Sequence, residues 1–171
     1  MVETGPRERF ARLLDEHGPA LARLAAVYEW DPVEREDLLQ EIGLAIWRAL
    51  PSFRGESTER TFVFRIAHNR GLTHRWRRRR QSLDLSAAEQ LPDEHSDPSA
   101  AVAEQEQHER LAAAIRRLPE IYRAAVVLTL EGLSQREVGE VLGAQENAIA
   151  ARLSRARRLL RDLLNAKEPA S

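Results

Sequence analysis

The sequence predicts an all-α protein of two small helical domains that are joined by a flexible acidic linker. Apolar residues recur every three or four positions in several segments, which is the spacing of amphipathic helices. No segment shows the strict alternation of apolar and polar residues that indicates a strand. An acidic stretch with proline and serine lies between two groups of helical segments. We therefore expect a first domain over 1–80, a linker over 81–103 and a second domain over 104–171.

Composition excludes several classes of protein. The chain of 171 residues has no cysteine, which excludes disulfide frameworks, thiolate zinc sites and cysteine nucleophiles. Its first residues are polar and no apolar stretch could span a membrane, so we expect a cytoplasmic protein without membrane insertion. Glycine-rich phosphate loops and nucleophile elbows are missing, and the five histidines are scattered. We expect no enzyme activity, no metal and no cofactor.

Charge is unevenly distributed along a chain whose net charge is only −1. Residues 54–80 hold nine arginines against two glutamates, residues 84–109 hold eight acids and no Lys or Arg, and residues 152–161 hold five arginines and no acid. Arginine suits bidentate contacts to phosphates and base edges better than lysine does. The pattern predicts two separate cationic surfaces.

Two helices are expected at the start of the first domain. Apolar side chains at helical spacing predict one over residues 8–29, which Gly18-Pro19 would bend or break. Asp31 can cap the second helix, with Pro32 at its first position, and Pro51 ends it. This second helix is acidic at its start and apolar on one face. It is either an ordinary amphipathic helix or one that docks on a basic partner.

A third helix is expected after Ser57 or Thr58, either of which can cap it. Aromatic side chains lie among its arginines, and it runs into four consecutive arginines at 77–80. Arginine and aromatic side chains together suit single-stranded bases, because every base offers a π-face and a phosphate. The alternative is that the aromatic residues belong to the core and the arginines form a solvated helix end.

The second domain contains the strongest motif, at residues 134–161. Helices are expected over 104–117 and 120–131 before it. Ser134-Gln135-Arg136-Glu137 has the form of a capping box, Gly143 stops the short helix, and an arginine-rich helix follows. This is the pattern of a helix-turn-helix, whose second helix enters the major groove of DNA. The alternative is a helical hairpin whose arginines are merely solvated.

Together these segments resemble the extracytoplasmic-function (ECF) class of bacterial sigma factors, in the sigma-70 family, over most of the chain. Residues 34–41 resemble the acidic motif that contacts the polymerase clamp, and residues 46–54 resemble the segment after it. Residues 61–69 resemble the promoter-melting segment, with Phe62 in place of the family's tryptophan. Residues 118–157 resemble the domain that reads the upstream promoter element. There Ala148-Ile149-Ala150-Ala151 stands where the family often has Thr-Val-Lys-Ser.

The resemblance implies a factor that binds the β′ clamp and β flap of core RNA polymerase, recognises the −10 and −35 promoter elements and promotes DNA melting. The first domain would be like sigma region 2 and the second like sigma region 4. The resemblance further implies an anti-sigma factor as a partner, and we expect the free protein to be a monomer.

The residues assigned to contacts fall into three groups. Those for core polymerase are Glu36, Asp37, Leu38, Gln40 and Glu41. Those for the downstream element and its melting are Arg54, Arg60, Phe62, Phe64, Arg65, His68, Asn69, Arg70, Arg75, Trp76 and Arg77. Those for the upstream element are Ser134, Gln135, Gln145, Glu146, Asn147, Arg152, Ser154, Arg155 and Arg158.

Alternatives remain for the linker and for the whole protein. The linker acids could mimic RNA near the polymerase exit, or they could cover the basic helices of the free protein. A stand-alone helix-turn-helix regulator would need residues 105–164 alone and would leave residues 8–80 unexplained. A helical adaptor without any role on DNA is the other interpretation.

Overall fold

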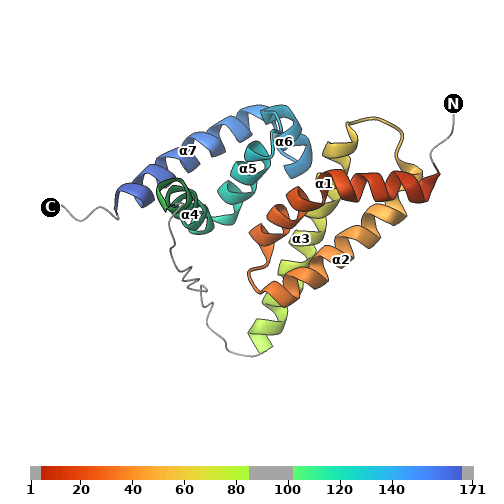
Figure 1. Ribbon diagram of the computed structural model, residues 1–171, viewed down its shortest axis with the longest axis horizontal. Coiled ribbons are helices and arrows are strands. Elements are labelled where there is room, and N and C mark those ends of the chain that lie inside the picture. The colour runs from red at the N-terminus through yellow and green to blue at the C-terminus, as the bar shows by residue number, and fades with distance from the viewer. Residues whose placement is uncertain (1–4, 85–101, 167–171) are drawn as a thin grey trace.

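The structure, a computed structural model, describes residues 5–84 and 102–166. These residues form helices only and contain no strand, which confirms the all-α prediction. Figure 1 shows two units side by side. The N-terminal unit consists of α1 (Pro6–Tyr28), α2 (Pro32–Ala49), the short 3-10 helix η1 (Leu50–Ser52) and α3 (Glu59–Asp84). The C-terminal unit consists of α4 (Val102–Arg116), α5 (Glu120–Leu130), α6 (Gln135–Leu142) and α7 (Glu146–Asn165).

The ends of the predicted linker differ from the structure. Helix α3 continues to Asp84, past the expected boundary at residue 80, and α4 begins at Val102. The middle of the linker, residues 85–101, lies outside the described residues. None of the helices in the described part of the chain is long and apolar enough to cross a membrane.

Helix α1 runs without interruption through Pro19. Of the two outcomes expected at Gly18-Pro19, the break is therefore wrong, and the bend stays a prediction. Proline at 19 removes the hydrogen bond that would reach the carbonyl of Asp15. Asp15 and Pro19 are both exposed, so a water molecule can donate a hydrogen bond to the Asp15 carbonyl instead. The buried side chains of Leu13 and Leu21, on either side of the proline, hold the helix against the core.

Side-chain caps start the next two helices where the sequence predicts them. The Asp31 carboxylate accepts hydrogen bonds from the backbone N–H groups of Val33 at 2.9 Å and Glu34 at 3.1 Å. The Thr58 hydroxyl accepts one from the N–H of Thr61 at 3.1 Å, which selects it over Ser57 as the cap of α3. These caps satisfy backbone donors that a helix start leaves free.

Helix α3 buries one face in the N-terminal unit, where Val63, Phe64 and Ala67 are buried. Gly71 continues this face, and a Cβ there would overlap the ring of Tyr28 at the end of α1. The glycine therefore allows the two helices to approach closely. Farther along, the buried His74 imidazole meets the buried Glu29 carboxylate at 2.9 Å.

The helix-turn-helix forms as the sequence predicts. The Ser134 hydroxyl accepts from the N–H of Glu137, and the Glu137 carboxylate accepts from the N–H of Ser134, so the capping box is complete. Gly143 ends α6 in the left-handed conformation, at φ 66°. Helix α7 then packs Ile149 and Leu153 into the core.

The two units share one hydrophobic core. Buried side chains of the N-terminal unit, such as Leu24 and Val27, belong to the same cluster as Leu118 and Leu128 of the C-terminal unit. Helix α1 contacts α5, and α3 contacts α6. The helix expected to melt DNA therefore lies against the first helix of the helix-turn-helix.

Candidate polymerase and nucleic-acid interfaces

Three of the five residues assigned to core polymerase lie exposed on α2. These are Glu36, Asp37 and Gln40. Leu38 is wholly buried, so its assignment as a contact is corrected: it supports α2 from the core. The Glu41 carboxylate is already paired with the Arg77 guanidinium of α3 at 2.6 Å. The first turns of α2 thus offer acids and an amide to a basic partner.

The aromatic residues of the melting segment have different environments. Phe64 is only 1% exposed, so its assignment to DNA is corrected, and the alternative of a core position holds for it. Phe62 is half-buried and lies 4.6 Å, centroid to centroid, from the ring of Phe53. The guanidinium of Arg9 lies over the same Phe53 ring at 5.2 Å. Phe62 thus reaches the surface within a small aromatic cluster.

Trp76 is 58% exposed, and the Arg80 guanidinium carbon lies 4.7 Å from the centroid of its ring. Such a pair presents a flat apolar surface beside a fixed positive charge, which suits an unstacked base and its phosphate. Arg80 was not among the assigned contacts, although its spacing of four residues from Trp76 places both on one helix face. Arg54, Arg65, Asn69 and Arg70 are also exposed.

Two arginines assigned to downstream DNA are held by the C-terminal unit. The Arg60 guanidinium donates to the Gly132 carbonyl at 3.3 Å and lies 3.2 Å from a Glu137 oxygen. Arg75 forms an ion pair with Glu120 at the start of α5. In this conformation these cations neutralise protein carboxylates.

His68 lies on α3, within the candidate melting segment. It is half-buried, and its Nδ1 shares a hydrogen bond with the Tyr28 hydroxyl. Burial, helped by the positive charge of Arg152 on α7, lowers the pKa of His68 to about 4. Burial also raises the pKa of the Tyr28 hydroxyl. The positive charge of α7 thus affects a residue of the melting segment.

The outer face of α7 is open. Helical spacing opposite the buried Ile149 brings small and cationic side chains together there. Its exposed members are Asn147, Ala148, Ala151, Ser154, Arg155 and Arg158. Gln145 and Glu146 are exposed at the helix start, whereas Arg152 is half-buried. Four of the nine residues assigned to the upstream element, Asn147, Ser154, Arg155 and Arg158, thus share the outer face of α7.

Two assigned residues precede or begin α6. The Ser134 hydroxyl lies 2.9 Å from a Glu137 oxygen and also serves as the helix cap. It is exposed, but its hydrogen-bonding capacity is largely used by the capping box. Gln135 is half-buried in the first turn of α6.

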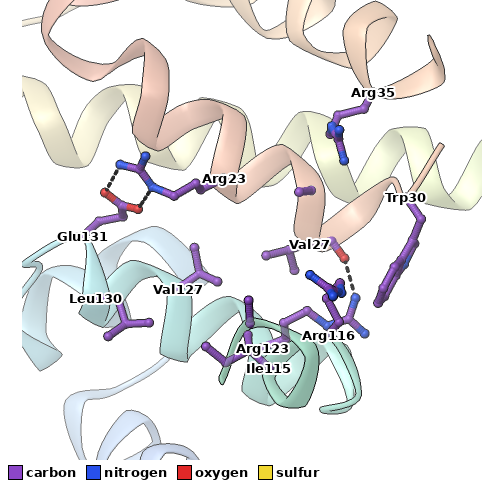
Figure 2. A pocket seen from close by; sticks show the side chains of 12 residues that line it. Arg23, Val27, Trp30, Arg35, Ile115, Arg116, Arg123, Val127, Leu130 and Glu131 are labelled. Atoms are coloured by element: carbon purple, nitrogen blue, oxygen red, sulfur yellow. Dashed lines mark hydrogen bonds and ion pairs between the residues drawn. The ribbon is translucent and has the colours of Figure 1, made fainter. Parts of the chain in front are cut away.

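A groove of about 600 Å³ lies between the units, along α1, α4 and α5. Figure 2 shows Arg23 paired with Glu131 at one end, and Arg123 directed at the Val27 carbonyl at the other, beside Trp30. Arg35 and Arg116 also line the groove, which gives it a positive, partly apolar wall. Among the residues that the structure describes, no cluster of acids and histidines could hold a metal ion.

The chain matches two family models in the order of its two units. Residues 13–81 match "Sigma-70 region 2" and residues 108–160 match "Sigma-70, region 4". The chain is 33% identical to the RNA polymerase sigma factor CnrH of Cupriavidus metallidurans, over 95% of this chain and 90% of that protein. It is 30% identical to the ECF RNA polymerase sigma-E factor of Escherichia coli, over 91% of this chain and 86% of that protein.

Solved structures show the same architecture. CnrH in complex with the cytosolic domain of CnrY is 29% identical and matches with a TM-score of 0.68, covering 95% of this chain and 91% of that one. The sigma factor RpoE of Bartonella quintana, in complex with the anti-sigma factor NepR, matches with a TM-score of 0.79 at 23% identity, covering 94% of this chain and 99% of that one.

Proposed function

Since this chain belongs to the ECF class of sigma-70 family RNA polymerase sigma factors, we propose that it joins core polymerase in the cytoplasm, recognises the −10 and −35 elements of its promoters and promotes melting. It acts by binding and has no catalytic role of its own. The observation that carries this proposal is the pair of exposed cationic helix faces, on α3 and α7, in one chain that also exposes an acidic helix start.

Helix α2 is the proposed contact with the polymerase β′ clamp. Glu36, Asp37 and Gln40 are exposed on it, and Leu38 and Ile42 fix the helix to the core beneath them. Carboxylates on a rigid helix can pair with basic side chains of a partner helix without much loss of conformational entropy. The acids of α2 therefore set the orientation of the docked factor.

Helix α3 is the proposed element for the downstream promoter and its melting. Arg65, Asn69 and Arg70 are exposed along it, and Trp76 with Arg80 forms a stacking surface farther on. Unstacking a base costs a few kcal/mol, and stacking on an aromatic ring returns about 1–3 kcal/mol per base. The exposed arginines add phosphate contacts that stabilise the separated strand.

Helix α7 is the proposed reader of the upstream element. The helix start, from Gln145 to Asn147, would enter the major groove, and Arg155 and Arg158 lie on the same exposed face. Arginine binds guanine O6 and N7 in a bidentate manner and also binds phosphates. The C-terminal unit further carries the proposed contact with the β flap.

An anti-sigma factor is the proposed regulatory partner. A structurally similar sigma factor, RpoE, is described in complex with the anti-sigma factor NepR, and another, CnrH, is described in complex with the cytosolic domain of CnrY. A partner of this kind would hold the two units of this chain in a state that cannot use a promoter.

A run-off transcription assay with core polymerase and a selected promoter library tests the proposal. We expect the wild-type chain to direct specific starts and an Asp37→Ala/Gln40→Ala variant to bind core polymerase more weakly. An Arg7→Ala variant, changed at an exposed residue at the start of α1, serves as the control. A stand-alone regulator would bind DNA without joining core polymerase, and an adaptor would direct no start at all.

A further inference from the structure

The groove along α1, α4 and α5 contains none of the residues that are assigned to polymerase or to DNA. Its volume of about 600 Å³ lies within the range of small-molecule sites, roughly 300–1,000 Å³. Seven of its twelve lining residues are apolar, four are arginines and one is a glutamate. Such a lining suits a small molecule that carries both an apolar part and negative charge.

Positive charge gathers at one end of the groove. Figure 2 shows Arg35 and Arg116 at this end, beside Trp30 and the buried Arg123. Arg123 donates three hydrogen bonds to two backbone carbonyls, and its guanidinium carbon lies 4.6 Å from the centroid of the Trp30 ring. Most of its donors are therefore in use, and it supplies a fixed charge to this end of the groove.

Arg35 and Arg116 are the cations of this end that a ligand can reach. Both are half-buried, and within residues 5–84 and 102–166 neither forms an ion pair. Arg35 comes from α2 and Arg116 from the last turn of α4, so they approach the groove from different helices. A planar guanidinium binds phosphate oxygens in a bidentate manner, and partial burial strengthens such bonds.

The other end of the groove is apolar and leads to a neutral pair. Val127 and Leu130 of α5 line it, and beyond them the Arg23 guanidinium donates to the Glu131 carboxylate at 2.8 Å (Figure 2). A hydrocarbon chain lying here would cover the pair without offering it any hydrogen bond, which costs free energy. A heteroaromatic ring could pack its face on the apolar side chains and offer the polar groups of its edge to the pair.

We propose that this groove binds a free nucleotide. The phosphates of a nucleoside diphosphate bind Arg35 and Arg116 at the Trp30 end, and its base packs on Val127 and Leu130. The distribution of charge sets this direction, because only the Trp30 end has cations without a lining acid. The site goes beyond the proposed function and does not depend on it.

Isothermal titration calorimetry of the full chain with the four ribonucleoside diphosphates, at fixed salt, tests the site. Inorganic pyrophosphate supplies the charge without the base, and the free nucleoside supplies the base without the charge. We expect at least one diphosphate to bind at least about tenfold more tightly than either part, because only the whole ligand uses both ends of the groove. The bound diphosphate should also raise the midpoint of thermal unfolding.

A double substitution tests the charged end. Arg35→Ala/Arg116→Ala should weaken binding of that diphosphate at least about tenfold, since the phosphates lose their charge-assisted hydrogen bonds. Arg155→Ala/Arg158→Ala removes the same charge from the outer face of α7, outside the groove, and is the matched control. This control should keep the wild-type affinity, which separates the groove from a general attraction of anions to basic surfaces.

A single substitution tests the apolar end. Leu130 is 64% exposed, so Leu130→Ser leaves the core intact. It should weaken binding of the diphosphate about threefold, through lost apolar contact, and leave binding of pyrophosphate unchanged. Ile121→Ser is the matched control, because Ile121 is an exposed residue of the same helix that does not line the groove.

Four results would overturn the proposal. The first is no binding of any of the four diphosphates, and the second is pyrophosphate binding as tightly as they do. The third is an equal loss of affinity in Arg155→Ala/Arg158→Ala. The fourth is tighter binding of a synthetic peptide of residues 85–101 than of any nucleotide, which would assign the groove to an acidic protein segment. The titrations of the wild-type chain decide the matter even where a variant fails to fold.

Discussion

The two basic helices of this protein differ in how much of their charge is available. Four arginines of α3 lie within ion-pair distance of glutamates from other helices: Arg60, Arg75, Arg77 and Arg78. In the described residues, Arg155, Arg157, Arg158 and Arg161 of α7 form no ion pair. Both helices look cationic in the sequence. A run of arginines in the sequence therefore gives the charge of a segment. The ion pairs that those arginines form in the fold decide how much of this charge is available to bind DNA.

The largest effect is expected from α7, the basic helix whose outer face is exposed. Replacing Arg155 and Arg158 together by alanine should weaken promoter binding by the holoenzyme at least about thirtyfold, since each arginine that reads a base contributes about 1–3 kcal/mol. The slope of log affinity against log salt should also fall by about one for each phosphate that the variant no longer neutralises. Filter binding over a salt series measures both quantities, with Arg7→Ala as the control. Equal affinities would show that α7 does not read the promoter.

A smaller effect is expected at the junction between the units. Arg123→Met should lower the free energy of unfolding by about 2–3 kcal/mol, because the carbonyls of Val27 and Leu118 would lose charged donors. Urea denaturation of the whole chain measures the change. Arg123→Lys keeps the charge without the planar fork and should recover only part of the stability. Full stability of the Met variant would mean that the junction does not depend on these bonds.

Acid should lower the free energy of unfolding through His68 of the melting segment. An unfolded histidine takes up a proton near pH 6.5, whereas folded His68 does so only near pH 4. The unfolded state therefore binds more protons across this window, and stability falls as the pH falls from about 6.5 to about 4. The loss is at most about 3 kcal/mol. Thermal unfolding at several pH values measures it, and His68→Gln should flatten the curve there. A curve that His68→Gln leaves unchanged would assign the acid sensitivity to other groups.

The smallest effect is expected for a pair within the N-terminal unit. Arg77→Ala removes the exposed contact with Glu41 and should change the free energy of unfolding by less than about 1 kcal/mol. Urea denaturation in low and high salt measures this contribution, which should shrink as salt rises. A decrease of several kcal/mol would mean that the arginines of α3 serve stability more than binding.

Local signals in the sequence predicted most helix boundaries. Asp31, the Ser134-to-Glu137 box and Gly143 each act through backbone groups within four residues, so their effect is visible in a short stretch of sequence. Pro19 is the exception, because its exposed position and the packing on both sides outweigh the usual cost of proline in a helix. The motif at 134–161 likewise depends on local caps and spacing.

The functional surfaces were harder to predict, because they depend on contacts between distant residues. Arg60 and Glu137 are 77 positions apart, so no local pattern could show that they meet. Leu38 and Phe64 lie beside exposed polar residues in the sequence, and only the rotation of each helix against the core shows that they point inward. Gly71 is similar, since its need for a small side chain arises from Tyr28 on another helix.

The hydrophobic core extends across both units, so the packing of one unit on the other affects how long the folded protein lasts in the cell. Leu118 and Leu128 pack in the same cluster as Leu24 and Val27, so separating the units bares apolar surface on each of them. Exposed apolar surface and locally unfolded helices make a protein more prone to proteolysis and aggregation. Substitutions that loosen the packing between the units should therefore shorten the lifetime of the protein in the cell.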